Sequence, residues 1–484
     1  MNTKTTVINQ EQLEAQFAFC DKIAAYWQSQ GRTPTAYVET YGCQQNEADS
    51  EKLRGYLTQS GYAIVQSAEG ADVVVMNTCS IREHAEQRVF GNLGALTHTK
   101  RRHPEQRIFL CGCMAGETKV SDRIKKSFPY VDGVFSTHHL WQFPEILYNV
   151  LTKKKRQFYI EDEAGSIAEG IPQVRDSSLK AWVSIMYGCN NFCSYCIVPY
   201  VRGRERSRRP EAILAECKAL IDSGCKEITL LGQNVNSYGL LPNGKRPEGG
   251  TSFAQLLRLV AESVPHMRVR FTTSNPEDMT EDILHAIADE PNLCRHIHFP
   301  AQSGSNKVLH LMNRKYTREQ YLERVAAIRR IIPGCGLTTD LFVGYHDEGE
   351  EEFQETLSLV REVGFDSAFM FKYSERPGTY ASKHLPDNVS EEEKVRRLNE
   401  LIRLQTEMSA ERNRMDEGKE FEILLERTAK RNPNQLMGRT EQNKAVVIDR
   451  GQHRIGETVR VRITGSTSAT LFGEVLDGDA KQKE

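Results

Sequence analysis

The middle of the chain alternates short apolar segments with amphipathic ones, and this alternation limits the possible folds more than any other feature. Six segments have the pattern of buried strands: "AWVSIMYG", "EITLLGQN", "RVRFTTS", "RHIHFPAQSG", "GLTTDLFVGY" and "DSAFMFKYS". Helical segments such as "PEAILAECKALIDSG" and "REQYLERVAAIRRII" lie between them. Strands that are apolar on both faces and alternate with helices form parallel sheets. Six such units predict a (βα)6 barrel or partial barrel, with chemistry at the carboxyl ends of its strands.

The regions on either side have different patterns. Before the middle region, the strand-like segments "TAYVET", "DVVVMNT" and "RIFLCG" alternate with helices, which predicts a second parallel sheet. After it, short strands spaced by turns predict a small β-barrel. We therefore expect an α/β protein in five parts: an N-terminal extension (1–34), an N-terminal domain (35–150), a linker that contains "TKKKRQ" (151–178), a central domain (179–415) and a C-terminal barrel (416–478).

Length, charge and cysteine content narrow the class of protein. The chain has 484 residues and a net charge of −2, so it has room for two or three domains and is not a polycation. Its start, "MNTKTTVINQEQLEAQFAFCDKIAAYW", lacks the long apolar run of a signal peptide or membrane span. We expect a cytoplasmic enzyme without membrane contact. Cysteines of such a protein stay reduced, so clusters among its twelve cysteines indicate metal binding or catalysis.

Three cysteines follow the first strand of the central domain with the spacing C-x3-C-x2-C. They are Cys189, Cys193 and Cys196, and no fourth cysteine or histidine follows within their loop. A structural zinc site would need a fourth ligand to complete its tetrahedron. Three thiolates on a four-iron cluster would instead leave one iron open to a substrate or cofactor. The loop therefore predicts an iron–sulfur site with an open position.

Three further cysteines of the N-terminal domain each come directly after a predicted strand. They are Cys43, Cys79 and Cys113. Because the carboxyl ends of parallel strands share one edge of a sheet, these thiols are expected to meet in space and form a second open cluster site. Cys111 lies within its strand and is expected to be a buried, inert thiol. The remaining cysteines are expected in the core: Cys20, Cys217, Cys225, Cys294 and Cys335.

The cysteine loop resembles the signature of radical S-adenosylmethionine (SAM) enzymes, and longer motifs resemble the methylthiotransferases of that superfamily. These motifs are "TYGCQQNEADSE", "NTCSIREHAEQRVFGNLG", "GCMA", "SIMYGCNNFCSYCIVPYVRGRERSR", "LLGQNVNSYG", "HFPAQSGSNKVLHLMNRKYTREQYL" and "FKYSERPGTYAS". The resemblance covers residues 35–476. It implies two 4Fe–4S clusters, one on each set of three cysteines. It also implies that SAM binds the open iron of the loop cluster and is split to a 5′-deoxyadenosyl radical, with Tyr195 beside its adenine.

Within this family, "RGRERSR" and "GQNVNSYG" resemble the branch that converts N(6)-(dimethylallyl)adenosine in the anticodon loop of tRNA to its 2-methylthio derivative. A ribosomal-protein branch and a threonylcarbamoyl-adenosine branch are the alternatives. The resemblance implies one SAM for the methyl group, a second for the radical, and sulfur insertion at carbon 2 of adenine. It implies a C-terminal TRAM domain for RNA. The expected partners are a tRNA anticodon stem–loop, a flavodoxin- or ferredoxin-like electron donor and a donor of sulfur or cluster. We expect a monomer.

Several polar residues at predicted strand ends are candidates for contact with SAM or the target base. They are Gly232, Gln233 and Asn234 after the second central strand, and Gln302 and Ser303 after the fourth. Ordinary capping of loops is the alternative for all five. We expect no indispensable acid–base pair, because the cofactors carry the hard chemistry.

Two basic stretches are candidates for anion binding. Five arginines lie between residues 202 and 209, beginning with Arg202, which we assign to cofactor binding. The run directly follows the cysteine loop, where the carboxylate of SAM or an RNA phosphate would arrive, although such runs are usually solvated surface. Residues 427–462 carry nine Lys or Arg against three Asp or Glu, which fits phosphate-led RNA binding or a solvated face of the barrel.

One loop departs from the pattern of the family that the chain resembles. The fifth central strand is followed by "GYHDEGEEEF", with His346 where proline is usual, Gly349 where threonine is usual, and the acidic Glu348 retained. The loop lies at the predicted catalytic end, and its role is left open.

Overall fold

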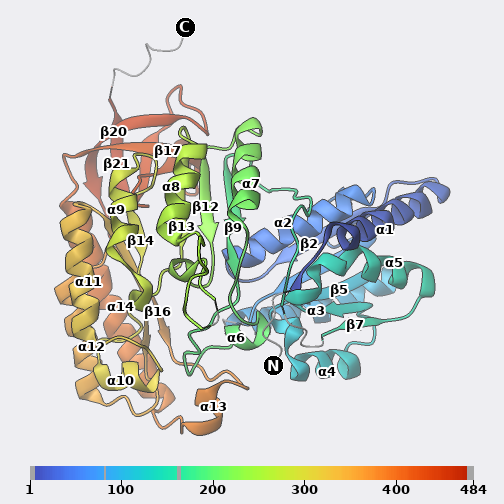
Figure 1. Cartoon of the computed structure of the whole chain (residues 1–484), viewed down its shortest axis with the longest axis horizontal. Coiled ribbons are helices and arrows are strands. Elements are labelled where there is room, and N and C mark those ends of the chain that lie inside the picture. The colour runs from blue at the N-terminus through green and yellow to red at the C-terminus, as the bar shows by residue number, and fades with distance from the viewer. Residues whose placement is uncertain (1–5, 81–82, 161–164, 242, 477–484) are drawn as a thin grey trace.

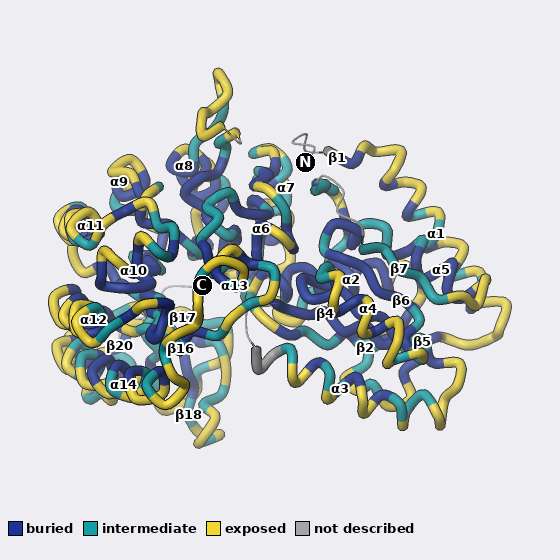
Figure 2. The backbone as a smooth tube through the Cα atoms, turned by 90° about the horizontal axis from the view of Figure 1, so that it is seen from below, coloured by how far each residue is buried: buried dark blue, intermediate teal, exposed yellow. Residues whose placement is uncertain are grey.

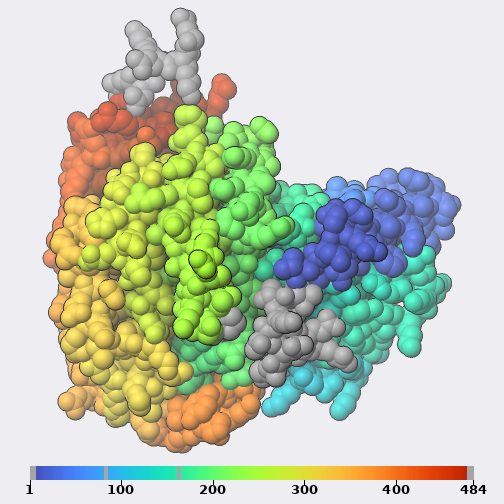
Figure 3. All heavy atoms as spheres, viewed as in Figure 1, coloured from blue at the N-terminus to red at the C-terminus, as the bar shows by residue number. Residues whose placement is uncertain are grey.

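The computed structural model describes residues 6–80, 83–160, 165–241 and 243–476. It contains an N-terminal parallel sheet with helices, a central partial barrel of β–α units and a closed C-terminal β-barrel (Figure 1). The N-terminal part forms a separate lobe beside the other two parts, which stack on each other (Figure 3). Among the described helices, none is long and apolar enough to cross a membrane.

The N-terminal part is a six-stranded sheet in which every neighbouring pair of strands is parallel. Its order is β3 (Ala63–Ile64), β2 (Thr35–Thr40), β4 (Val73–Thr78), β5 (Arg107–Gly112), β6 (Gly133–Phe135) and β7 (Gln157–Tyr159). One face packs against α1 (Gln10–Ser29), α2 (Gln44–Gln59) and α5 (Phe143–Lys153). The other packs against α3 (Glu83–Arg102) and α4 (Thr118–Ser127). The parallel sheet predicted from the alternation of apolar strands and helices is confirmed.

The segments expected to be an N-terminal extension (1–34) and a linker (151–178) contribute helices and strands to the N-terminal part. α1 begins at a capping box, in which Asn9 Oδ1 accepts from Gln12 N at 2.8 Å and Gln12 Oε1 accepts from Asn9 N at 3.0 Å. The helix packs into the core through Leu13, Cys20 and Ile23. β7 forms the edge of the sheet, and β1 (Thr6–Val7) pairs with β8 (Ser166–Ile167). Residues on both sides of 35–150 are therefore built into this fold.

The central part contains the six strands that the sequence predicts. They are β9 (Lys180–Ser184), β12 (Glu227–Leu231), β13 (Arg268–Thr272), β14 (His296–His298), β15 (Gly336–Val343) and β16 (Ser367–Lys372). They form two parallel triplets, β9-β12-β13 and β14-β15-β16, which a bridge between Val269 and Leu293 connects. Within the described residues β9 and β16 do not pair, so the barrel is partial. The predicted partial barrel is confirmed.

Helices cover the outside of this barrel, and its buried residues lie within (Figure 2). The covering helices are α7 (Pro210–Asp222), α8 (Phe253–Ser263), α9 (Glu281–Asp289), α11 (Arg318–Ile331), α12 (Glu350–Val363) and α14 (Glu391–Arg414). Two short helices, α10 (Asn306–Leu311) and α13 (Tyr380–His384), lie at the carboxyl end of the barrel. A two-stranded hairpin of β10 (Met186–Tyr187) and β11 (Arg206–Ser207) flanks the cysteine loop, with α6 (Val198–Val201) inside it.

The C-terminal part is the small closed barrel that the sequence predicts. Its strands are β17 (Glu420–Ala429), β18 (Asn432–Arg439), β19 (Ala445–Asp449), β20 (Thr458–Ser466) and β21 (Leu471–Val475). It is attached to the amino ends of the central strands. Arg268 Nη1 donates to Arg439 O at 2.7 Å, and Arg270 donates to the carbonyl oxygens of Thr440 and Glu441 at 2.7 and 2.8 Å. The C-terminal barrel therefore lies at the end of the central barrel opposite the carboxyl ends of its strands (Figure 1).

Helix α2 joins the N-terminal and central parts. It is buried on all sides, because the N-terminal sheet covers one face and β9 with its flanking segments covers the other. Gln45 Nε2 donates to Ser184 Oγ at 2.8 Å, and Lys52 Nζ donates to Tyr187 Oη at 2.8 Å. Midway along the helix, Gly55 packs directly on the backbone of Pro172, where a Cβ atom would lie 2.0 Å from the carbonyl oxygen. The close approach of the two parts therefore requires glycine here.

Substitution of Gly55 tests this junction. Gly55→Ala is expected to lower the free energy of unfolding by about 1–3 kcal/mol, because the methyl group forces α2 and Pro172 apart. Gly94→Ala is the matched control in α3, where a Cβ atom meets nothing within 4 Å. It is expected to raise stability by about 0.5–1 kcal/mol through the higher helix propensity of alanine. Urea unfolding of both variants measures the difference, and equal behaviour would contradict the packing argument.

Candidate functional site

The first site lies where three neighbouring strands of the N-terminal sheet end, and we call Cys43, Cys79 and Cys113 the N-terminal cysteine set. Cys43 is the N-cap residue of α2 after β2, while Cys79 and Cys113 directly follow β4 and β5. Gly42 has a φ of +128°, and a Cβ atom there would lie 2.4 Å from the Cβ of Cys79. Burial, together with the nearby thiols of Cys79 and Cys43, raises the pKa of Cys113 to about 12, although Arg202 opposes the shift. The sheet thus brings the three thiols within electrostatic reach of one another.

The second site is the loop between β10 and β11, and we call Cys189, Cys193 and Cys196 the loop cysteine set. Gly188 precedes it with a φ of +75°, and a Cβ atom there would lie 2.2 Å from the carbonyl oxygen of Arg204. Ser194 fastens the loop to the end of α10, because its backbone N–H donates to Met312 O at 3.0 Å and its hydroxyl to Leu311 O at 2.6 Å. Burial and the neighbouring Cys193 thiol raise the pKa of Cys196 to about 12.

The donor atoms of each set bear on whether it holds a cluster or a single ion. Within the described residues, no three His, Cys, Asp or Glu side chains are close enough together to hold one metal ion. A zinc site needs ligand atoms about 2.0–2.3 Å from a shared centre. A four-iron cluster binds each thiolate through a different iron, so its ligands lie farther apart. Three thiols in each set supply the ligands of an open four-iron cluster, whereas a structural zinc site would need a fourth ligand.

Arg202 does not meet the loop set that precedes it in sequence. Its guanidinium reaches into the N-terminal part, where Nε donates to Cys113 Sγ at 3.1 Å and Nη2 pairs with Asp49 Oδ2 at 3.0 Å. Only 4% of Arg202 is exposed. The residue that sequence analysis assigned to SAM or phosphate therefore contacts the N-terminal cysteine set.

The rest of the arginine run is also mostly internal. Arg206 is buried, and its Nη1 donates to the carbonyl oxygens of Arg202 and Arg204 at 3.1 and 2.7 Å. Arg208 is buried between Glu169 and Glu216, at 2.6 and 2.7 Å. Only Arg204 and Arg209 are exposed. Arg202, Arg206 and Arg208 therefore fill fixed internal positions and are not part of a solvated surface.

Arg314 was not among the residues singled out from the sequence, although it lies in one of the quoted motifs. Its Nη1 donates to Cys193 Sγ at 3.2 Å, its Nε to Tyr316 Oη at 3.0 Å and its Nη2 to Asn275 Oδ1 at 3.3 Å. Each cysteine set thus has one arginine with an N–H directed at a thiol. A lone arginine between polar residues carries no sequence signal for this contact.

The strand-end candidates of the central barrel differ in their surroundings. Gly232 packs on Met186, where a Cβ atom would lie 2.6 Å from Cγ, and Gln233 is half-buried. Asn234 is buried and donates to Asp278 at 2.6 Å. Ser303 bonds to Thr356 Oγ1 at 3.2 Å, which favours loop capping for this residue.

Tyr195, the candidate for contact with the adenine of SAM, lies among aromatic rings. Its ring centroid is 5.2 Å from that of Phe342 and 6.2 Å from that of Tyr345.

Unpartnered polar atoms gather at these same strand ends. Among the described residues, five buried oxygen atoms that follow β12, β13 and β14 have no hydrogen-bond partner: Asn234 Oδ1, Asn236 Oδ1, Thr273 Oγ1, Ser274 Oγ and Gln302 Oε1. Buried polar atoms normally have partners, so a polar ligand at this edge would complete them. Thr273 and Ser274 were missed from the sequence because they read as the end of a strand.

The divergent loop after β15 is closed by contacts within the protein. His346 is fully buried, with Nδ1 2.6 Å from Pro386 O and Nε2 3.1 Å from Tyr373 Oη. Glu348 Oε1 accepts from Gly344 N at 2.7 Å and pairs with Arg397 of α14 at 2.9 Å. Of the departures at this loop, His346 is therefore held by Pro386 and Tyr373, whereas the retained Glu348 attaches the loop to α14.

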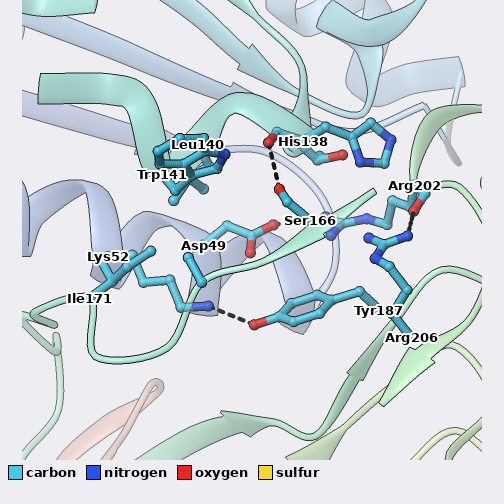
Figure 4. Close-up of a pocket in the computed structure, with 12 residues that line it drawn as sticks. Asp49, Lys52, His138, Leu140, Trp141, Ser166, Ile171, Tyr187, Arg202 and Arg206 are labelled. Carbon is cyan, nitrogen blue, oxygen red and sulfur yellow. Dashed lines mark hydrogen bonds and ion pairs between the residues drawn. The ribbon is translucent and has the colours of Figure 1, made fainter. Parts of the chain in front are cut away.

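A cavity of about 50 Å³ lies between the N-terminal and central parts, beside Arg202 (Figure 4). It is lined by Asp49, Lys52, His138, Tyr187 and Arg206 among others. Burial, with Arg206 as the next cause, lowers the pKa of His138 to about 3, so this ring is neutral. The cavity has room for a few water molecules.

Comparison with known protein families assigns a description to each of the three parts. Residues 183–360 match the Radical SAM superfamily, residues 35–136 match the uncharacterized protein family UPF0004, and residues 414–476 match the TRAM domain.

Similar curated proteins extend over nearly the whole chain. The chain is 54% identical over 441 residues to a tRNA-2-methylthio-N(6)-dimethylallyladenosine synthase of Phocaeicola vulgatus, which covers 90% of this chain and 95% of the relative. It is 50% identical over 440 residues to the protein of the same name from Clostridium botulinum, with 91% and 96% covered. Among solved structures, the radical SAM methyltransferase TsrM from Kitasatospora setae has a TM-score of 0.50 at 12% identity, over 69% of this chain and 72% of that one. This last likeness concerns the fold alone.

The unpartnered oxygen of Gln302 gives a test of the strand-end site. Gln302 has a φ of +68°, which asparagine tolerates, so Gln302→Asn shortens the side chain without straining the backbone. It is expected to weaken SAM binding about tenfold, which corresponds to the loss of one hydrogen bond of about 1.4 kcal/mol. Anaerobic equilibrium dialysis with labelled SAM measures the affinity. Ser303→Ala is the control and is expected to leave it unchanged. A similar loss in both variants would show that Gln302 Oε1 is not the contact.

Proposed function

The chain belongs to the family of tRNA-2-methylthio-N(6)-dimethylallyladenosine synthases, and on this premise we propose that it is a tRNA methylthiotransferase. Its proposed reaction converts N(6)-(dimethylallyl)adenosine in the anticodon loop to the 2-methylthio derivative, with sulfur insertion at carbon 2 and methylation from a second SAM. The observation that carries the proposal is the pair of three-cysteine sets, each at the carboxyl edge of a parallel sheet, in a chain 54% identical to such a synthase over 90% of its length.

Membership of the radical SAM superfamily implies a 4Fe–4S cluster and SAM as cofactors. We propose that Cys189, Cys193 and Cys196 hold this cluster and that Cys43, Cys79 and Cys113 hold a second. The chemistry of the donor sets supports this assignment, since each supplies three thiols and leaves a position open. When bound, the loop cluster and SAM supply the radical, and the second cluster carries the sulfur to be transferred.

The residues of the chain position the reactants and exclude water. The unpartnered oxygens of Asn234, Thr273 and Gln302 can accept hydrogen bonds from SAM or the target base. Tyr195 and its aromatic neighbours form an apolar wall beside the loop set. α2 is buried between the N-terminal sheet and β9 of the central part. We assign no side chain to a proton transfer.

The C-terminal barrel supplies basic loops for RNA. Exposed cations lie near the end of β17, in the turn between β17 and β18, and in the segment between β19 and β20: Arg427, Lys430, Arg431, Arg450 and Arg454. Within the described part of the chain, none of them forms an ion pair. By contrast, Arg460 and Arg462 of β20 pair with Glu420. The loops are therefore the better phosphate contacts.

We further propose a cytoplasmic monomer that takes electrons from a flavodoxin- or ferredoxin-like donor and sulfur from a separate donor. The radical reaction requires one-electron reduction, and the net transfer of sulfur to adenine requires that the sulfur be replaced after each turnover.

Iron content and product analysis test the function. Anaerobically reconstituted protein is expected to hold about eight irons, as two four-iron clusters. With dithionite it should cleave SAM to 5′-deoxyadenosine and form 2-methylthio-N(6)-dimethylallyladenosine in tRNA, detected by mass spectrometry. Cys113→Ala should retain about four irons and lose the product. Cys111→Ala, which changes the buried thiol two residues earlier, should retain all of them. Zinc, or a single cluster in the unaltered protein, would contradict the proposal.

Charge removal on the C-terminal barrel tests the RNA contact. Replacement of Arg427, Lys430 and Arg431 by alanine is expected to weaken tRNA binding and to reduce the slope of log affinity against log salt by about one for each phosphate that is no longer bound. The matched control replaces Arg460 and Arg462, which both pair with Glu420, and should change the slope less. Filter binding across a salt series measures both slopes. A larger effect in the control would place the RNA elsewhere.

A further inference from the structure

Each cysteine set is contacted by one arginine from the central part of the chain. The Arg202 Nε to Cys113 Sγ distance is 3.1 Å, and the Arg314 Nη1 to Cys193 Sγ distance is 3.2 Å. Arg202 follows the loop set in sequence by six residues yet serves the other set, whereas Arg314 serves the loop set itself. One arginine is thus provided for each proposed cluster.

Both guanidinium groups are held in fixed orientations by their remaining N–H groups. Asp49 of α2 binds Nη2 of Arg202 at 3.0 Å (Figure 4). Tyr316 and Asn275 bind Nε and Nη2 of Arg314 at 3.0 and 3.3 Å. Because the guanidinium is planar and rigid, these contacts also fix the N–H that faces the thiol. The contacts to sulfur are therefore built into the fold and do not depend on mobile surface side chains.

Hydrogen bonds to ligand sulfurs are one of the main determinants of the reduction potential of an iron–sulfur cluster. An N–H donor or a positive charge beside a thiolate stabilises the reduced cluster, which carries one more negative charge. From the two contacts, and on the basis of the proposed function, we propose that Arg202 and Arg314 are positioning residues. Each orients one ligand thiolate and raises the reduction potential of its own cluster.

The partners of the two arginines predict unequal effects. The charge of Arg202 is compensated by Asp49, so its influence comes mainly from the directed hydrogen bond. Arg314 is bound by a phenol and an amide, and among the described residues it forms no ion pair. It therefore keeps its full charge beside Cys193. Removal of Arg314 is expected to have the larger effect.

The experiment measures each potential separately. The loop cluster is studied in protein whose Cys43, Cys79 and Cys113 are alanine, and the N-terminal cluster in protein whose Cys189, Cys193 and Cys196 are alanine. Dithionite titration followed by electron paramagnetic resonance gives the one-electron midpoint potential. Arg314→Met is expected to lower the reduced-to-oxidised ratio of the loop cluster about tenfold at a fixed potential, a shift of 59 mV. It should leave the N-terminal cluster unchanged. Arg202→Met should shift only the N-terminal cluster, and by less.

Further variants separate positioning from folding. Arg202→Lys and Arg314→Lys keep the positive charge but replace the planar guanidinium group with a flexible ammonium group. They should shift the reduction potentials in the same directions by smaller amounts. Arg204→Met, an exposed change in the same run, should shift neither potential. If a Met variant loses iron, loss confined to the matching cluster supports the proposal. Unchanged potentials, equal shifts in both clusters, or loss of both clusters would overturn it. Failure of the unaltered protein to bind two clusters would instead contradict the proposed function, and the arginine of the remaining cluster would still be tested.

Discussion

The burial of α2 between two sheets is the constraint on which the rest of the structure depends. The helix begins at Cys43, which belongs to the N-terminal cysteine set, and one turn and a half later it supplies Asp49 to Arg202. A further turn and a half on, Gly55 packs on the backbone of Pro172. Since one rigid element carries all three contacts, its position defines the relation between the carboxyl edges of the N-terminal sheet and the central barrel. The position of α2 therefore determines where the two cysteine sets lie relative to each other.

α2 is unusually polar for a buried helix. Polar and charged side chains of α2 are buried along with its apolar ones, and several of them bond across the junction: Gln45 to Ser184, Asp49 to Arg202, and Lys52 to Tyr187. Buried ion pairs add little net stability, because the cost of removing charge from water offsets their attraction. Their directional bonds instead penalise any other docking of the two parts. We infer that the junction favours one orientation more than it maximises stability.

The sequence predicted the parallel sheet, the six central strands and the closed barrel, because each depends on a local repeat of apolar residues. Cysteines placed directly after strands could likewise be assigned to sheet edges from the pattern alone. By contrast, α1 and β7 were not predicted as part of the N-terminal fold. α1 precedes the first predicted strand, and no local pattern shows that its apolar side chains pack on the sheet, while β7 is a short edge strand of half-buried residues. The burial of three arginines of the run was not predicted for a related reason. Sequence shows where charge lies along the chain, but the carboxylates and carbonyl groups that bury Arg202, Arg206 and Arg208 come from distant segments.

The attachment of the C-terminal barrel to the amino ends of the central strands has a geometric consequence. The strands between the two ends are five to eight residues long for β9, β12, β13 and β15, or roughly 17–26 Å at about 3.3 Å per residue. A molecule held at both ends must run along the outside of the central barrel for this length. On the proposed function, an RNA bound by the C-terminal barrel would have to span this length for its target base to reach the cysteine sets, so the length of the central barrel would select RNAs by the distance between the bound backbone and the base.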